Sequence, residues 1–149
     1  MNSAPVLERL ALDAVAAVES ADSAAITIGT ERRPAVATDE TARLLDAYQR
    51  STSDGPSLDA YRTGNVSRLC CTTGGRWTQL KAACEWHQIR SVAAFPIVNS
   101  DGLVAAVLTL YSTDHHAFGA NEIRAGLRLI LGSDDVLADL PDPHTASVE

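Results

Sequence analysis

The stretch SVAAFPIVNSDGLVAAVLTLY, residues 91–111, decides the fold. Two strongly apolar segments, residues 91–98 and 103–111, flank the sequence NSDG, in which Asp101-Gly102 supplies the positive φ angles of a tight hairpin turn. The sequence therefore predicts an antiparallel β-hairpin. The second segment is apolar or threonine throughout, which predicts a central strand that is covered on both faces.

Outside this hairpin, hydrophobic periodicity and turn residues predict helices that alternate with short strands. The predicted helices cover residues 4–18, 40–49, 58–63, 77–87 and 121–131. The further strands cover residues 23–28, 35–38 and 66–71, of which the first two form a second hairpin. In the helix at 40–49, we expect Leu44, Leu45 and Tyr48 to form the apolar side. This order predicts an α+β fold with a central antiparallel sheet of five to six strands, flanked by helices.

Composition restricts the class of protein. The chain has 149 residues, 46% hydrophobic and 21% charged, which is typical of one globular domain. The formal net charge is −7 and no basic stripe is visible, so we expect no nucleic-acid binding through this chain. No segment approaches the ~18 consecutive apolar residues of a membrane span. With three cysteines and no secretory signal, we expect reduced thiols in a cytoplasmic protein.

The charge distribution also suggests a domain boundary. Five of the 19 acidic residues follow Leu131, and no Lys or Arg does. We therefore expect residues 1–131 to form the folded domain and residues 132–149 to form an acidic, flexible tail.

Four short sequence words, in order, carry a resemblance to a known family. They are YQ followed by DGPSLDAYRTG within residues 48–64, RW at 76–77, IRSV with FP within 89–96, and GL with LTLYS within 102–112, before Phe118 and Glu122. Over residues 6–131 they resemble the GAF domain, in particular the GAF domains of actinobacterial regulators that carry an RNA-binding ANTAR domain. The resemblance implies a GAF/PAS-like fold and a non-enzymatic sensory domain that binds a small molecule or a protein partner and acts in regulation by dimerisation.

The resemblance also implies a place for a ligand pocket, between the sheet and the segment at residues 54–77. This segment is rich in glycine and polar turn residues, which permits a concave wall. The candidate pocket residues are Leu58, Tyr61, Leu69, Trp77 and Phe95. The ligand is unknown, and the sequence requires no cofactor. A domain that binds no ligand and serves only as a dimerisation scaffold is the alternative.

Three cysteines are candidates for redox chemistry: Cys70, Cys71 and Cys84. Adjacent strand residues point to opposite faces, so only one of Cys70 and Cys71 can face a pocket. Buried cysteines that serve only as small hydrophobic residues are more common. A cysteine-based redox sensor, or a protein like the free-methionine sulfoxide reductases of the same fold, is the alternative function.

No catalytic residue or metal site is expected. His87 falls at a helix end, where the last-turn carbonyl groups explain it. His115 and His116 are adjacent in a predicted loop and lack the further Cys or His ligands that tetrahedral zinc requires.

The two terminal helices carry narrow apolar stripes. The first stripe contains Leu7, Leu10, Ala14 and Val18, and the second contains Ile123, Leu127 and Ile130. Each stripe either covers a face of the sheet or forms a helix bundle between two copies of the chain. The resemblance favours a homodimer through these helices, with Leu10 at the interface.

Overall fold

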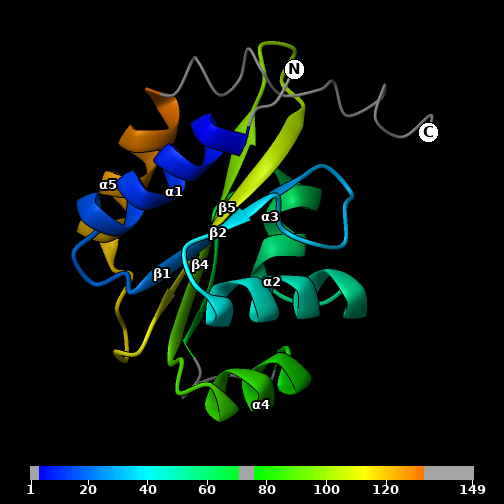
Figure 1. Ribbon diagram of the computed structural model, residues 1–149, viewed down its shortest axis with the longest axis vertical. Coiled ribbons are helices and arrows are strands. Elements are labelled where there is room, and N and C mark those ends of the chain that lie inside the picture. Colours follow the sequence, from blue (N-terminus) through cyan, green and yellow to red (C-terminus); the bar gives the residue numbers. More distant parts are fainter. Residues whose placement is uncertain (1–3, 71–75, 133–149) are drawn as a thin grey trace.

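An antiparallel sheet lies at the centre of the protein, in a computed structural model that describes residues 4–70 and 76–132 (Figure 1). The strand order is β2-β1-β5-β4-β3, and each neighbouring pair is antiparallel. The strands are β1 (Ser23–Ile28), β2 (Val36–Ala37), β3 (Ser67–Cys70), β4 (Ser91–Val98) and β5 (Val104–Ser112). The helices are α1 (Ala4–Ala17), α2 (Glu40–Thr52), α3 (Pro56–Thr63), α4 (Thr78–Trp86) and α5 (Ala120–Leu131). The predicted α+β class is confirmed.

Both predicted hairpins are confirmed, and β4–β5 is the longer of the two. In its turn, Asn99 Oδ1 accepts hydrogen bonds from the backbone N–H groups of Asp101 at 2.9 Å and Leu103 at 3.0 Å. Gly102 has a φ of 82°, which side chains disfavour. Strand β5 lies between β1 and β4, and all its residues after Val104 are buried, as expected for a central strand.

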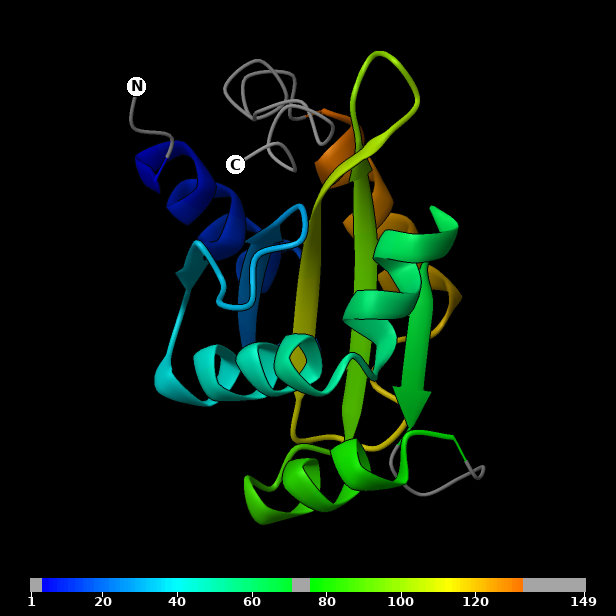
Figure 2. The same ribbon diagram turned by 90° about the vertical axis from the view of Figure 1, so that its right-hand side faces the viewer.

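The two faces of the sheet are covered by different helices. Figures 1 and 2 show α1 and α5 on one face, α2 and α3 on the other, and α4 beside α2 at one end of the sheet. Successive strand residues point to opposite faces, so each strand serves both layers. We call these layers the terminal-helix face (α1 and α5) and the α2–α3 face.

The terminal-helix face is an apolar core. The stripes of α1 and α5 pack against the sheet of their own chain, and Leu10 has only 4% of its surface exposed. The cluster joins Leu7, Leu10, Ala11, Ala14, Val18 and Ile130 to the strand residues Ala24, Ile26, Ala93, Phe95, Ile97, Ala106, Leu108 and Leu110. The expectation of Leu10 at a dimer interface is therefore wrong, because this side chain is already buried within one chain.

Helix boundaries differ from the sequence prediction around residues 50–57. Helix α2 continues to Thr52 and ends at Ser53, which has a left-handed backbone with a φ of 54°. Helix α3 begins at Pro56, because proline suits a first-turn position where its missing N–H is not needed. These shifts shorten the loop between α2 and α3 to three residues.

Some expectations fall outside the described residues. These are Cys71 at the predicted end of β3 and the acidic tail from Ser133 onward. Within the described residues, no helix combines the length and the apolar character that crossing a membrane requires.

Candidate functional site

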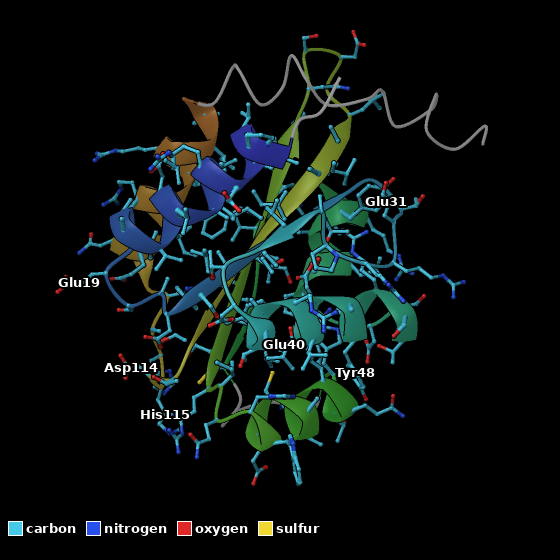
Figure 3. The ribbon with its side chains drawn as sticks, viewed as in Figure 1. Glu19, Glu31, Glu40, Tyr48, Asp114 and His115 are labelled. Atoms are coloured by element: carbon cyan, nitrogen blue, oxygen red, sulfur yellow. The ribbon has the colours of Figure 1, made fainter. Side chains whose placement is uncertain are left out.

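Helix α2 presents a polar stripe to the sheet. Its buried residues are Ala42, Leu45, Asp46, Gln49 and Arg50, at the i, i+3, i+4, i+7 and i+8 spacing of one helix face. The expected apolar side was partly wrong: Leu44 is exposed, and Tyr48 is only half-buried (Figure 3). Hydrophobicity could not find this stripe, because three of its five members are polar.

Asp46 is the centre of a buried hydrogen-bond network. Its Oδ1 accepts from the Tyr111 hydroxyl of β5 at 2.8 Å, and its Oδ2 accepts from the Thr27 hydroxyl of β1. Gln49 Nε2 donates to the Tyr111 oxygen at 2.8 Å, and Gln49 Oε1 accepts from the backbone N–H of Ser57 at 2.8 Å. One network therefore joins β1, β5, α2 and the first turn of α3.

Burial controls the protonation of this network. Burial raises the pKa of Asp46, and this outweighs the lowering by the hydrogen bonds from Thr27 and Tyr111 and by the charge of Arg50. Burial also raises the pKa of Tyr111 well above its ordinary value, and the nearby charge of Asp46 raises it further. Tyr111 therefore remains a phenol that donates to Asp46.

Gly55 allows α3 to approach α2 at this network. Its φ is 126°, a conformation that side chains rarely adopt, and a Cβ at this position would overlap the side chain of Gln49. The glycine in the DGPSLDA word thus lets Gln49 reach the backbone of Ser57.

Arg50 is a buried cation with unused hydrogen-bond donors. Its side chain comes from α2, and the residue is 6% exposed. Nη1 donates to the carbonyl oxygen of Gly29 at 2.6 Å, and the guanidinium carbon lies 5.4 Å from the centroid of the Tyr61 ring. Burial lowers the pKa of Arg50, although the charge of Asp46 acts in the opposite direction.

The other edge of this guanidinium has no partner. Nε and Nη2 of Arg50 are both buried, and neither makes a hydrogen bond within the described part of the chain. The Oγ of Ser57 is also buried, and it also lacks a hydrogen-bond partner. Each buried donor without a partner costs about 1–3 kcal/mol, and more when the group is charged. The α2–α3 face therefore carries polar groups that the fold does not need.

The predicted pocket residues do not come together as one lining. Tyr61 lies on α3 against Arg50, and Leu58 is half-buried on the same helix. Leu69 and Trp77 belong to the cluster beside α4. The prediction that Phe95 lines this pocket is wrong. Strand alternation places Phe95 on the terminal-helix face, where its ring packs against Gly126 of α5.

Residues from two of the motifs that carry the family resemblance contact each other near Trp77. Arg76 stacks over the Trp77 ring, with its guanidinium carbon 4.0 Å from the ring centroid. Arg76 also forms an ion pair with Asp59 of α3 at 3.6 Å. Both partners are partly exposed, so this contact positions the start of α4 more than it stabilises the fold.

The cysteines occupy different environments. Cys70 lines a surface pocket of about 400 Å³ at the end of β3, with Arg68, Leu69, Ser91, Val92, His116, Phe118 and Gly119. The Sγ atom of Cys70 lies 3.6 Å from the Nδ1 atom of His116. The backbone of His116 has a positive φ of 53°. Cys84 is fully buried on α4. Cys71 lies outside the described residues.

The histidines give no metal centre in the part of the chain that the structure describes. No group of three or more His, Cys, Asp or Glu side chains there could hold a metal ion. His87 follows α4, and its backbone N–H donates to the last-turn carbonyl groups. Asp114 and His115 are exposed in the loop between β5 and α5 (Figure 3).

Several solved structures share this arrangement. A domain of a protein described as a two-component sensor histidine kinase from Sinorhizobium meliloti superposes with a TM-score of 0.71 at 16% identity, covering 99% of this chain and 98% of that chain. A GAF domain/HD domain protein from Geobacter sulfurreducens gives 0.67 at 18% identity, covering 92% of each chain. A type II free methionine-R-sulfoxide reductase from Thermoplasma acidophilum gives 0.63 at 10% identity, covering 94% and 95%.

At these identities the structural neighbours show the fold: a helix-flanked antiparallel sheet of the GAF type. The family model for the GAF domain matches residues 3–132, so the chain belongs to the GAF domain family. No curated protein sequence matches the chain significantly.

Proposed function

We propose that this GAF domain is a non-enzymatic sensor that binds a small molecule at the α2–α3 face. GAF domains are typically sensory or signalling modules, and the family membership supports that class. The observation that carries the proposal is Arg50, a buried cation with two N–H groups that lack partners. Groups of this kind are expensive in a structural core and are expected at binding sites.

The best test is native mass spectrometry of the protein purified from its own host. We expect a bound species whose mass exceeds that of the chain and that is lost when Arg50 is replaced by lysine. Arg43→Lys is the matched control, because Arg43 lies on the exposed side of α2 and pairs with Glu40. A wild-type protein that carries no ligand, and whose stability responds to no compound in an unbiased metabolite screen, would instead favour the scaffold alternative.

Signal output is proposed to act through a cytoplasmic homodimer formed by the terminal helices. The α1 stripe and Ile130 are buried, Ile123 and Leu127 are partly buried, and α1 and α5 also expose Leu12 (47%) and Leu131 (77%). A second copy of the chain would cover these side chains. Size-exclusion chromatography with light scattering checks this: we expect a dimer at micromolar concentration that Leu12→Glu dissociates. A monomeric wild type would refute the proposal.

We propose the regulatory role of the protein from the four sequence motifs. Their likeness to GAF domains of actinobacterial GAF–ANTAR regulators supports a role in transcription regulation. Because this chain offers no basic stripe, the regulatory output is proposed to pass to another protein and not directly to nucleic acid.

A thiol-based sensor is the second candidate function, favoured by the pair of Cys70 and His116. His116 would accept the thiol proton, and the thiolate sulfur would attack the terminal oxygen of a hydroperoxide. An S–O bond forms while the O–O bond breaks, the leaving alkoxide takes the proton from His116, and the products are a sulfenic acid and an alcohol. The arrangement of one accessible thiol beside a base supports this chemistry.

Dimedone labelling followed by mass spectrometry tests the second candidate. We expect label at Cys70 after peroxide treatment, loss of label in Cys70→Ser and retention in the buried-site control Cys84→Ser. Absence of label at Cys70 in the wild type would reject the thiol sensor. Turnover of free methionine sulfoxide that depends on Cys84 would instead support a reductase.

A further inference from the structure

The edge of Arg50 that lacks partners has a defined shape. In an arginine side chain, Nε–H and one Nη–H point in parallel and match the two oxygens of a carboxylate. The structure contains an example about two turns away on α2: Nε of Arg43 donates to Glu40 Oε1 at 2.8 Å, and its Nη2 donates to Oε2 of the same carboxylate. The two unpartnered atoms of Arg50 are the same pair, Nε and Nη2.

The guanidinium of Arg50 is held in position from two sides. Its Nη1 is fixed by the carbonyl oxygen of Gly29 at the end of β1, and its plane lies against the ring of Tyr61 on α3. These contacts leave the Nε–Nη2 edge as the remaining binding surface. Such fixed geometry lowers the ordering cost of binding.

No acidic side chain of the described residues accepts a hydrogen bond from this edge. Asp46 is four residues earlier on the same helix, but its two oxygens accept hydrogen bonds from Tyr111 and Thr27. No ion pair of Arg50 is formed there, whereas the exposed Arg43 has one. The missing partner is therefore an anion that the described chain does not supply.

We infer that Arg50 is the anchor of the ligand, and that the ligand class is a small planar oxyanion, either a short carboxylic acid or nitrate, held by Nε and Nη2. This inference rests on the proposed small-molecule site and specifies its chemistry. Both donor atoms are buried, so a compact anion needs the least rearrangement of the surrounding chain to reach them. Entry requires movement of the cover, which consists of α3 and of the loop between β1 and β2 that follows Gly29 and carries Glu31 (Figure 3).

The buried hydroxyl of Ser57 extends the inference. It lies one helical turn before Tyr61 on α3, and its Oγ also lacks a partner. This hydroxyl is proposed as a second contact for a ligand that carries a hydrogen-bond acceptor beyond its carboxylate. A two-point ligand of this kind links α2 to α3, the helices that the Gln49–Ser57 hydrogen bond already connects.

The experiment is thermal unfolding of the full chain in sodium formate, sodium acetate, sodium nitrate or sodium phosphate, against sodium chloride at equal ionic strength. We expect a saturable rise of the unfolding midpoint of about 3 °C or more in at least one planar anion, and no such rise in tetrahedral phosphate. The formate and acetate arms together identify a carboxylate ligand, and the nitrate arm identifies nitrate.

Two variants locate the effect. Arg50→Lys keeps the positive charge but removes the parallel donor pair, so it should weaken binding of the active anion at least tenfold. Arg43→Lys makes the same change on the exposed side of α2 and should bind as the wild type does. If Arg50→Lys fails to fold, backbone amide NMR of the wild type replaces it, with anion-dependent shifts expected at Gly29, Tyr61 and the last turn of α2.

Equal midpoints in all four salts and in chloride would overturn the inference, as would a shift that persists in Arg50→Lys. An outcome in which native mass spectrometry finds an uncharged ligand while no anion stabilises the protein would also overturn it. The proposed sensory function would then stand without this ligand class.

Discussion

The two faces of the sheet differ in what they bury. On the terminal-helix face, α1 and α5 enclose an apolar cluster in which the Phe95 ring packs against Gly126. On the α2–α3 face, the same sheet is covered by Asp46, Gln49 and Arg50, and Arg50 and Ser57 retain buried side-chain groups without hydrogen-bond partners. Because an apolar stripe would cover the sheet at lower cost, we propose the ligand site on the polar face.

The largest expected effect is that of Leu10→Glu on the terminal-helix face. Leu10 is buried against the sheet of its own chain, so the substitution places a carboxylate without a partner in an apolar core. We expect loss of the folded state, seen as a flat thermal unfolding curve in circular dichroism. A folded variant that is merely monomeric would restore the interpretation of Leu10 as a dimer contact.

Phe95→Ala should be the next largest change. The ring is fully buried and fills the space over Gly126, so its removal leaves a cavity that α5 cannot close. We expect a loss of about 3–5 kcal/mol in the free energy of unfolding, measured by urea denaturation. Ligand affinity should be unchanged in the protein that remains folded, and a selective loss of affinity would return Phe95 to the pocket.

A pH series with Asp46→Asn tests the polar face. Burial raises the pKa of Asp46 in the folded state, so its stabilising contribution is complete below the unfolded-state pKa of about 3.9 and is lost as pH rises through the folded-state pKa. Relative to Asp46→Asn, the wild type should therefore lose free energy of unfolding as pH rises above about 4. Parallel pH profiles of the wild type and Asp46→Asn would show that burial does not raise the pKa of Asp46 in the folded state.

Arg50→Met should have the smallest effect on stability. The change removes one hydrogen bond to Gly29, and it also removes a buried charge with two donors that lack partners. These contributions oppose each other, so we expect a change within about 1 kcal/mol in the free energy of unfolding without ligand. Leu45→Ala on the same helix is the control, with an expected loss of about 2–5 kcal/mol. An equal loss in Arg50→Met would make Arg50 a structural residue.

Hydrophobic patterning was sufficient for the framework of the fold. The strands at residues 23–28 and 91–98 were predicted at their observed limits, because both combine a dense apolar or β-branched run with clear turn residues. The Asp101-Gly102 pair gave the central hairpin for the same reason. The helix ends near Ser53 and Pro56 were predicted wrongly, since a left-handed serine cap has no strong sequence signal.

The polar face could not be predicted in the same way. Its stripe on α2 is hidden from hydrophobicity by Asp46, Gln49 and Arg50, and its partners Thr27 and Tyr111 lie on distant strands that only the sheet brings together. A signal was present, because Asp46, Gln49 and Arg50 continue the helical spacing of Ala42 and Leu45. The prediction that Phe95 lines the pocket was wrong for a different reason. The resemblance placed Phe95 on a strand, but it did not show which face of the sheet its side chain occupies.

Hydrogen–deuterium exchange of the wild type, with and without the anion that raises the unfolding midpoint, tests most directly the claim that the two faces have different roles. The account predicts slower exchange in α2, α3 and the β1–β2 loop around Gly29, because the ligand ties Arg50 to its surroundings. Exchange in the segments of α1 and α5 that pack on the sheet should change much less. Added protection confined to α1 and α5, with none in α2 and α3, would contradict the account.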